Sequence, residues 1–308
     1  MNKIERVQAA LNGEPVDRVP ASFWFHFGPD RVEGHAMAQA HLDYYRRADQ
    51  DFLKVMNDNR YALIGIDQIR RPEDWRSVKP SPISSQPYQA QLDGLREILD
   101  AIGDEVPVVT TVFNPYATGN YISARQVTEH LLADPESVSA GLAAVAESLA
   151  QFSHACIEAG AAGLFFSAQG SEIDRFSEEH FQAHIQPHDL VVLQAAQEAG
   201  ATFNLLHICG QSVRLAAYVD YPAHAVNWGP QHDNPSLVEG KALLGRTVIG
   251  GVDERGPIVT GPRAAIEAEV RATINAMGTT GFMVGAGCTV PNDVAVEHLV
   301  WAREAVAG

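Results

Sequence analysis

The chain has few cysteines, few basic residues and no long apolar run. Only three cysteines occur in 308 residues, and a small odd number in a long chain argues against a disulfide framework. Lys and Arg number 22 against 38 Asp and Glu, a formal charge of −16, which repels the phosphate backbone of nucleic acids. No window approaches the roughly 18 to 20 apolar residues that a membrane span needs. We therefore expect a cytoplasmic protein in a reducing compartment, with neither nucleic acid nor membrane as a partner.

Two phosphate-binding motifs are also missing. No G-x-G-x-x-G follows the first apolar run, and no G-x-x-x-x-G-K-[ST] occurs anywhere in the chain. Both motifs act by placing backbone N–H groups around phosphate oxygens. The sequence therefore gives no support for nucleotide binding.

The chain is instead rich in apolar residues, at 46%, and it alternates strand-like with helix-like segments. Short apolar runs rich in β-branched or aromatic residues recur, separated by turns and by longer stretches of helical spacing. The predicted strands are residues 18–26, 51–56, 106–114, 163–170, 202–210, 225–229, 246–253 and 281–288. The clearest predicted helices, judged by their Pro start signals and Gly end signals, are 135–159, 187–199, 262–277 and 293–306.

This alternation predicts a parallel sheet. Eight strand–helix units in about 300 residues fit a TIM-type barrel better than an open doubly wound sheet of five or six strands. We predict an α/β fold with a single domain over residues 1–308, a (β/α)8 TIM-type barrel with an N-terminal helical extension. The active site of such a barrel lies at the C-terminal ends of its strands, so the last residues of each run are the candidates.

A histidine and two cysteines are among these strand-end residues. His207 and Cys209 are two positions apart on one predicted strand, so their side chains share a face, and Cys288 ends the last strand. One histidine with two cysteines is a catalytic zinc ligand set that leaves a fourth position open. The same residues could equally be small buried cysteines and a hydrogen-bonded core histidine. Cys156 lies in a predicted helix, and we assign it to core packing.

Other polar or aromatic residues near the strand ends are candidates for substrate binding. Trp228 and Tyr116 would offer flat apolar contact at the rim, or simply pack in the barrel. Asn114, Gln169 and Asp253 would contact polar groups of a substrate, although a loop hydrogen bond explains each equally well. The full set of candidate substrate residues is His26, Asn114, Tyr116, Gln169, Trp228, His232 and Asp253.

Several segments resemble the uroporphyrinogen decarboxylase superfamily over nearly the whole chain. They are ERVQAALNGEPVDRVPASFWFHF, EAGAAGLFFSAQG, FNLLHICG, VIGGVDERGPIVTGP and GFMVGAGCTVPNDVAVEHL. The decarboxylase branch carries an R-Q-A-G-R loop that grips the propionates of its tetrapyrrole, whereas the corresponding place here reads FGPDRVEGHAM. This departure speaks against decarboxylation of uroporphyrinogen despite the shared scaffold.

The H-x-C pattern with a distant cysteine resembles the zinc motif of the methylcobamide:coenzyme M methyltransferases and related corrinoid methyltransferases. The resemblance implies that His207, Cys209 and Cys288 bind Zn²⁺, with no catalytic residue beyond this site. Glu172 is a candidate fourth ligand that an incoming thiol would displace, the alternative being a surface salt bridge.

The same resemblance implies the reaction and its partners. It implies methyl transfer between a corrinoid and a thiol or other small acceptor, and a homodimer by analogy. The corrinoid would be methylcobalamin or a corrinoid carrier protein, because the D-x-H-x-x-G motif typical of cobalamin binding is absent.

Two other functions stay open on the sequence. One is a metal-independent decarboxylase or lyase that acts on a small carboxylated substrate with Asp253 or His26 as acid or base. The other is a non-catalytic barrel that binds a corrinoid or another small molecule. The lyase would work without metal, and the binding barrel would keep its ligand after loss of either cysteine.

Overall fold

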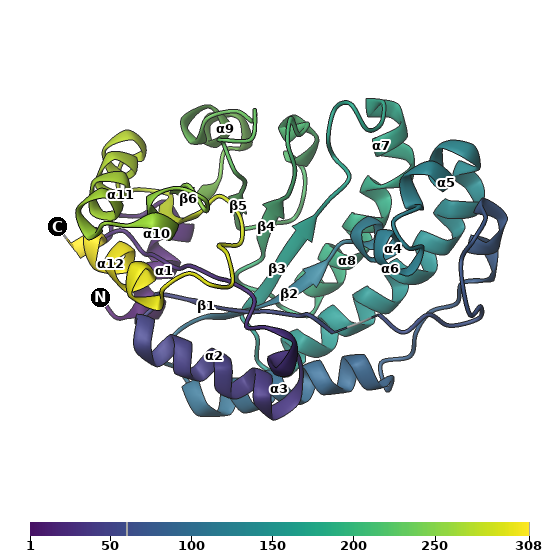
Figure 1. Ribbon diagram of the computed structural model, residues 1–308, viewed down its shortest axis with the longest axis horizontal. Coiled ribbons are helices and arrows are strands. Elements are labelled where there is room, and N and C mark those ends of the chain that lie inside the picture. The colour runs from purple at the N-terminus through teal and green to yellow at the C-terminus, as the bar shows by residue number, and fades with distance from the viewer. Residues whose placement is uncertain (60, 308) are drawn as a thin grey trace.

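The computed structural model describes residues 1–59 and 61–307, and its strands form one curled parallel sheet (Figure 1). Each strand pairs with the next along the chain, in the order β1-β2-β3-β4-β5-β6-β7. The strands are β1 (Leu53–Val55), β2 (Val108–Phe113), β3 (Gly163–Ala168), β4 (Leu205–Ile208), β5 (Ala225–Asn227), β6 (Thr247–Val252) and β7 (Phe282–Ala286). This topology is that of a TIM-type barrel.

The strands form where the sequence is continuously apolar. All six residues of β3 are buried, as are all five of β7, which is the pattern of parallel strands covered on both faces. Seven of the eight predicted runs contain an observed strand. The observed strands are shorter, because the polar residues that end each run leave the ladder at the edge of the sheet.

The first predicted strand, residues 18–26, is wrong as a regular strand. The segment is extended, but only Ala21 forms a bridge, parallel to Val284 of β7. Ser22 N donates to Val284 O at 3.1 Å, and Val284 N donates to Pro20 O at 2.8 Å. Pro20 has no N–H to continue a ladder, which accounts for the short pairing.

On its other side this segment meets the start of β1 mainly through side chains. Asp51 N donates to Ala21 O at 3.0 Å. Ser22 Oγ donates to Phe52 O at 2.8 Å, and Gln50 Oε1 accepts from Phe23 N at 2.8 Å. The segment therefore lies between β7 and β1 and closes the barrel.

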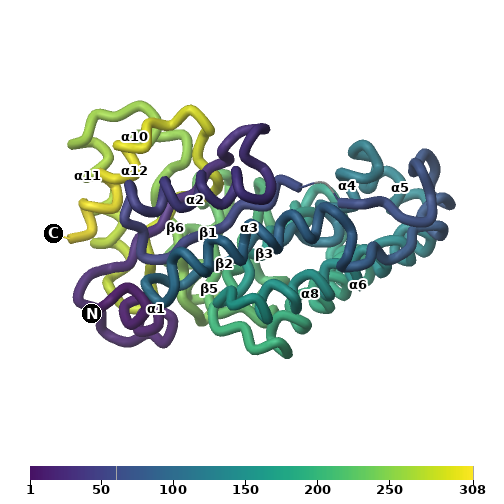
Figure 2. The backbone as a smooth tube through the Cα atoms, turned by 90° about the horizontal axis from the view of Figure 1, so that it is seen from below, coloured from purple at the N-terminus to yellow at the C-terminus, as the bar shows by residue number. Residues whose placement is uncertain are grey.

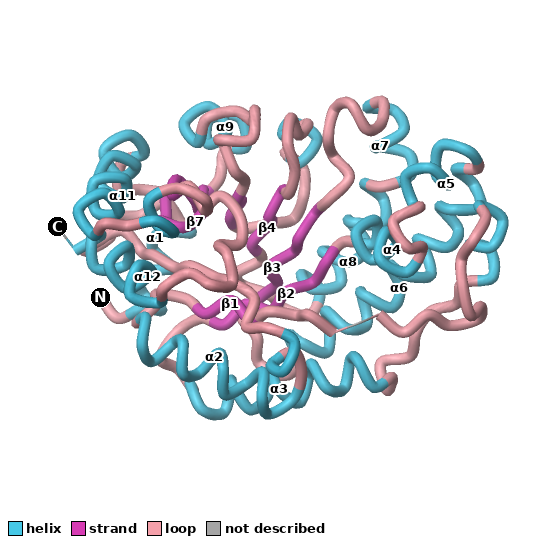
Figure 3. The backbone as a smooth tube through the Cα atoms, in the orientation of Figure 1, coloured by secondary structure: helices cyan, strands magenta, loops and turns pink. Residues whose placement is uncertain are grey.

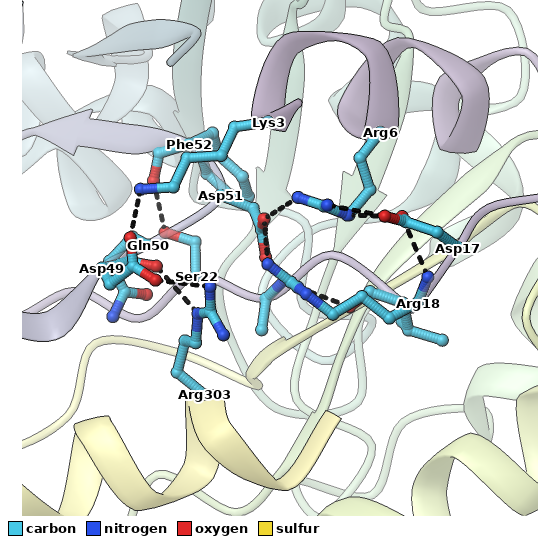
Figure 4. A network of polar contacts seen from close by, with 12 residues as sticks. Lys3, Arg6, Asp17, Arg18, Ser22, Asp49, Gln50, Asp51, Phe52 and Arg303 are labelled. Atoms are coloured by element: carbon cyan, nitrogen blue, oxygen red, sulfur yellow. Dashed lines mark hydrogen bonds and ion pairs between the residues drawn. The ribbon is translucent and has the colours of Figure 1, made fainter. Parts of the chain in front are cut away.

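The centre of this closure is the buried carboxylate of Asp51 (Figure 4). It accepts from Arg6 Nη1 at 2.9 Å, from Arg18 Nη1 and Nη2 at 2.6 and 2.8 Å, and from Ala21 N at 2.8 Å. Arg6 belongs to α1 (Lys3–Leu11) and also binds Asp17. Hydrogen bonds between charged groups are the strong ones, so this cluster ties α1 and the closing segment to β1.

Helices cover the outside of the sheet (Figure 3). Two pairs lie against each other, α2 with α3 and α6 with α8 (Figure 2). The longer helices are α2 (Gly34–Ala48), α3 (Gln86–Ile102), α6 (Pro135–Glu158), α8 (Gln186–Glu198), α11 (Arg263–Met277) and α12 (Val296–Glu304). Shorter ones are α4 (Pro115–Ile122), α5 (Val127–Ala133), α7 (Glu178–His184), α9 (Leu237–Leu244) and α10 (Pro257–Thr260).

The four predicted helices correspond to α6, α8, α11 and α12. Asp134 caps α6, its side chain accepting from Ser137 N, as the Asp-Pro signal indicates. The last helix begins at Val296, later than predicted, and ends in a 3-10 turn. The helix α1 lies at the start of β6, where Thr247 Oγ1 donates to Ala10 O at 2.8 Å. In the described residues no helix has the length and apolar character needed to cross a bilayer.

We expect Asp51→Asn to lower the free energy of unfolding by about 3 kcal/mol or more, because it removes the buried counter-charge of Arg6 and Arg18. Urea denaturation followed by circular dichroism measures the loss. Asp49→Asn is the matched control: Asp49 pairs with Lys3 and Arg303 at 2.6 Å, but its side chain is 62% exposed, so its loss costs less than about 1 kcal/mol. Equal losses in the two variants would contradict a closing role for Asp51.

Candidate metal centre and its cavities

The structure brings His207, Cys209 and Cys288 together at the C-terminal edge of the sheet. His207 lies in β4, Cys209 follows that strand directly, and Cys288 follows β7. Their ligand atoms all lie within 4.8 Å of one another, and Cys288 Sγ is 3.6 Å from His207 Nε2. Within residues 1–59 and 61–307 this is the one such group of three or more metal-ligating side chains. Because β5 and β6 separate β4 from β7, it is the curl of the sheet that makes the group.

The tautomer of His207 is fixed by Asn227, which sequence reasoning did not select. Asn227 Nδ2 donates to Ile249 O at 2.8 Å and to Ala286 O at 3.0 Å, so its Oδ1 faces His207 Nδ1 at 2.6 Å. An amide oxygen accepts only, so Nδ1 carries the proton. The lone pair of Nε2 is then left free on the side of the two cysteines, the arrangement seen in metal-binding histidines.

The two thiols of the group differ in acidity. A hydrogen bond from Cys209 lowers the pKa of Cys288. The same hydrogen bond and burial raise the pKa of Cys209. Cys288 is thus the more acidic thiol of the pair, and a cation bound between the two sulfurs would displace the remaining thiol proton.

Two cavities adjoin the group. The larger has a volume of about 550 Å³ and the smaller about 280 Å³. His207, Cys209 and Cys288 line both, as do Arg255 and Thr289. A ligand in either cavity can therefore reach the two sulfurs.

The larger cavity contains two of the predicted substrate residues, His26 and Gln169. His26 Nδ1 lies 2.7 Å from Asp58 Oδ1, an ion pair when the ring is protonated. Gln169 also lines a neighbouring cavity of about 310 Å³ with Asp58. These residues place polar groups where a small substrate would enter.

Lys54 of β1 also lines the larger cavity, and sequence reasoning missed it. Its side chain is buried, with Nζ 4.2 Å from the centre of the Phe165 ring. Burial lowers the pKa of Lys54 to about 7, while Asp58 and Cys288 act in the opposite direction. The sequence feature that could have identified Lys54 is a lysine inside the apolar run DFLKVM.

The smaller cavity contains His232, another predicted substrate residue, and Glu254. His232 Nε2 lies 2.7 Å from Glu254 Oε1, and Glu254 is 3% exposed. The predicted residue Asp253 lines neither cavity, and its Oδ1 accepts from Arg255 N at 2.8 Å instead. Sequence reasoning therefore selected Asp253, whereas its neighbour Glu254 is the residue that lines the smaller cavity.

Glu172, the candidate fourth ligand, lies beside the group but outside it. A Cβ added at Gly210 would come within 3.1 Å of Glu172 Cγ, which places this side chain next to the residue that follows Cys209. Its carboxylate accepts two hydrogen bonds from Arg175, at 2.7 and 2.8 Å. Glu172 could act as a ligand only after Arg175 releases it.

Three other predicted substrate residues are buried away from the two cavities. Asn114 caps α4, where its Oδ1 accepts from Ala117 N, and its Nδ2 donates to Gln169 O and Asp189 Oδ1. Tyr116 OH bonds Thr128 Oγ1 at 2.6 Å. Trp228 is fully buried, with Nε1 donating to the carbonyl of residue 235 at 2.8 Å. All three therefore position loops and helices.

Cys156 is fully buried in α6, which confirms its assignment to the core.

Comparison with known proteins gives a family and several relatives. The model of the uroporphyrinogen decarboxylase (URO-D) family matches residues 61–308. The methylcobamide:CoM methyltransferase MtaA of Methanosarcina barkeri is 22% identical over 311 residues, covering 87% of this chain and 88% of that protein. The methylcobamide:CoM methyltransferase MtbA of Methanosarcina mazei is 21% identical over 319 residues, covering 92% and 91%.

Solved structures share the fold. A methyltransferase from Methanosarcina mazei matches with a TM-score of 0.77 at 18% identity, covering 99% of this chain and 98% of that one. A B12-independent methionine synthase from Shewanella sp. W3-18-1 matches with a TM-score of 0.62 at 12% identity, covering 94% and 97%. At these identities the likeness concerns the fold alone.

In the metal-free protein we expect iodoacetamide to alkylate Cys288 at about pH 6, where a thiol with an ordinary pKa of about 8.5 is protonated. Peptide mass spectrometry of timed samples gives the rate at each cysteine. Cys156 is an internal control, since burial raises its pKa. Cys209→Ala removes the hydrogen-bond donor and should slow the alkylation of Cys288. The same rate in the variant and in the wild type would contradict the effect of Cys209 on the pKa of Cys288.

Proposed function

The chain belongs to the uroporphyrinogen decarboxylase (URO-D) family, and from this premise we propose that it is a zinc-dependent methyltransferase. It moves a methyl group between a corrinoid and a thiol or other small acceptor. The observation that carries the proposal is the convergence of His207, Cys209 and Cys288 within 4.8 Å at the floor of two cavities. The names of the relatives MtaA and MtbA support the same reaction class.

The residues of the group fit zinc. One nitrogen and two sulfurs are the donors that Zn²⁺ prefers, and three protein ligands leave a fourth position for a substrate. Asn227 orients the free lone pair of His207 toward the sulfurs. A zinc ion bound there would lower the pKa of a thiol at the fourth position and so present it as a thiolate.

The two cysteines also set the charge of the site. As thiolates, Cys209 and Cys288 contribute two negative charges, which balance a divalent cation. The sulfur of a substrate thiolate therefore keeps much of its electron density for attack on the methyl carbon. Glu172 is proposed as the ligand that holds the fourth position before substrate binds, after its release from Arg175.

The larger cavity is proposed as the place where the thiol and the methyl group meet. Its wall contains Phe113, Phe165 and Val290, which exclude water from the reacting atoms. His26 and Gln169 would hold polar groups of the substrate, and His232 would do so in the smaller cavity. Holding sulfur and methyl carbon at about 3 to 3.5 Å makes the step nearly unimolecular. The corrinoid comes as free methylcobalamin or on a carrier protein.

One observation favours a second candidate function. His26 lines the larger cavity and pairs with Asp58, which lines the neighbouring one, and a histidine oriented by a carboxylate can act as a general acid or base. The pair would suit a metal-independent lyase acting on a small carboxylated substrate. Such an enzyme would turn over its substrate after removal of all metal, which separates it from the methyltransferase.

We expect purified protein to contain about one zinc per chain, since three protein ligands are the number used in catalytic zinc sites. Elemental mass spectrometry measures the content. Cys209→Ala and Cys288→Ala should each lose most of the metal, while Cys156→Ala should keep it. Full metal in either ligand variant would overturn the assignment of the site.

We expect the zinc-loaded protein to demethylate methylcobalamin when a small thiol is present. The change in the visible spectrum of the corrinoid follows the reaction. Cys209→Ala and Cys288→Ala should lower the rate by about a hundredfold or more, because thiol activation by a metal contributes several kcal/mol. Cys156→Ala should retain the rate. Equal rates before and after chelation of the metal would exclude the zinc mechanism.

A further inference from the structure

Lys54 is a buried lysine that forms no ion pair with any residue that the structure describes. It lies in the middle of β1 between two buried residues, and it is 4% exposed. Nζ lies 2.6 Å from Met56 Sδ and 4.2 Å from the centre of the Phe165 ring. Among the residues that the structure describes, no carboxylate oxygen lies within 4 Å of this ammonium group. A buried charge of this kind costs several kcal/mol unless a partner compensates it.

The charged groups around Lys54 do not supply that partner. Asp58 is already paired with His26. His41 of α2 donates from Nδ1 to Met37 O and accepts at Nε2 from Met56 N, and burial lowers its pKa to about 4. Cys288 is the remaining anionic group that acts on Lys54, and metal binding would neutralise it. The Lys54 amine therefore has no ion-pair partner among these groups and is available to an anionic ligand of the cavity.

Lys54 is connected to the candidate metal centre through the ring of Phe165. Its ammonium lies over Phe165, and the Phe165 ring stacks on the ring of His207 at 5.3 Å. Lys54 lines the same cavity as His207, Cys209 and Cys288. A divalent cation with two cysteine thiolates is neutral, so a third, substrate thiolate would bring one net negative charge.

We infer that Lys54 is the counter-cation of the substrate sulfur, and that it makes the site prefer a thiolate over the methylated thioether. This inference rests on the proposed function. On binding, the thiol S–H bond breaks, and its proton goes to the Lys54 amine when that is neutral and to solvent otherwise. In the transfer the S–CH₃ bond forms and the methyl–cobalt bond breaks, with its electron pair staying on the corrinoid. The thioether is uncharged, so the attraction ends with the reaction and favours product release.

The test uses Co²⁺ in place of zinc, because a substrate thiolate bound to cobalt increases the charge-transfer absorption that Cys209 and Cys288 already give, and this increase reports binding without turnover. Wild type, Lys54→Met and Lys79→Met are titrated with 2-mercaptoethanol, whose only ionisable group in this range is its thiol. Lys79 is exposed, so Lys79→Met is a matched control. Affinity for the thioether 2-(methylthio)ethanol is measured by competition.

We expect Lys54→Met to weaken binding of 2-mercaptoethanol by about tenfold or more at about pH 7, because an opposite charge lowers the pKa of an acid by about 1 to 3 units. Thioether binding should change less than about twofold, and Lys79→Met should match the wild type. Met is similar in length to Lys and removes a buried charge, so the variant should unfold at the same or a higher temperature.

Unchanged thiol affinity in Lys54→Met would overturn the inference. The inference would also be overturned if Lys54→Met lost affinity for 2-mercaptoethanesulfonate but not for 2-mercaptoethanol, because Lys54 would then bind the acid group of the ligand. Failure of the proposed function looks different. In that case the cobalt–thiolate absorption of the wild type itself would not increase when any thiol is added.

Discussion

Barrel closure through Asp51 is the interaction on which the site depends. The sheet has β1 and β7 at its two edges, and the extended segment around Ala21 joins them. Lys54 comes from one edge, and Cys288 follows the other. His26 is the last residue of the closing segment. Only in the closed barrel do these three residues line one cavity, so a polar cluster at the seam positions the residues of the candidate site.

A second constraint is the chain of hydrogen bonds behind His207. Asn227 is held by two backbone carbonyls, from β6 and β7, and it holds His207 Nδ1 in turn. Three neighbouring parts of the sheet therefore fix one ring orientation. This rigidity leaves the exposed side of the ring and the two cysteine sulfurs preorganised for a ligand, with little to reorder on binding.

The two cavities beside the cysteines differ in charge. The larger is lined by Lys54, His26 and Asp293, and the smaller by His232 and the buried carboxylate of Glu254, while Arg255 lines both. The buried amine therefore faces the larger cavity and the buried carboxylate faces the smaller one. Under the proposed function, a substrate thiolate would lie on the side of Lys54, although the chain as a whole is strongly acidic.

The sequence by itself determined the alternation of strands and helices, the barrel-type fold and the pair His207 and Cys209, because periodicity and a two-residue spacing are local properties. The tertiary structure decided which distant residues meet. It turned Lys54 and Asn227 toward the site and assigned Trp228 to packing. It also left the first predicted strand as a closing segment. These outcomes depend on how far the sheet curls and where each side chain points after it closes, and no local pattern in the chain encodes that.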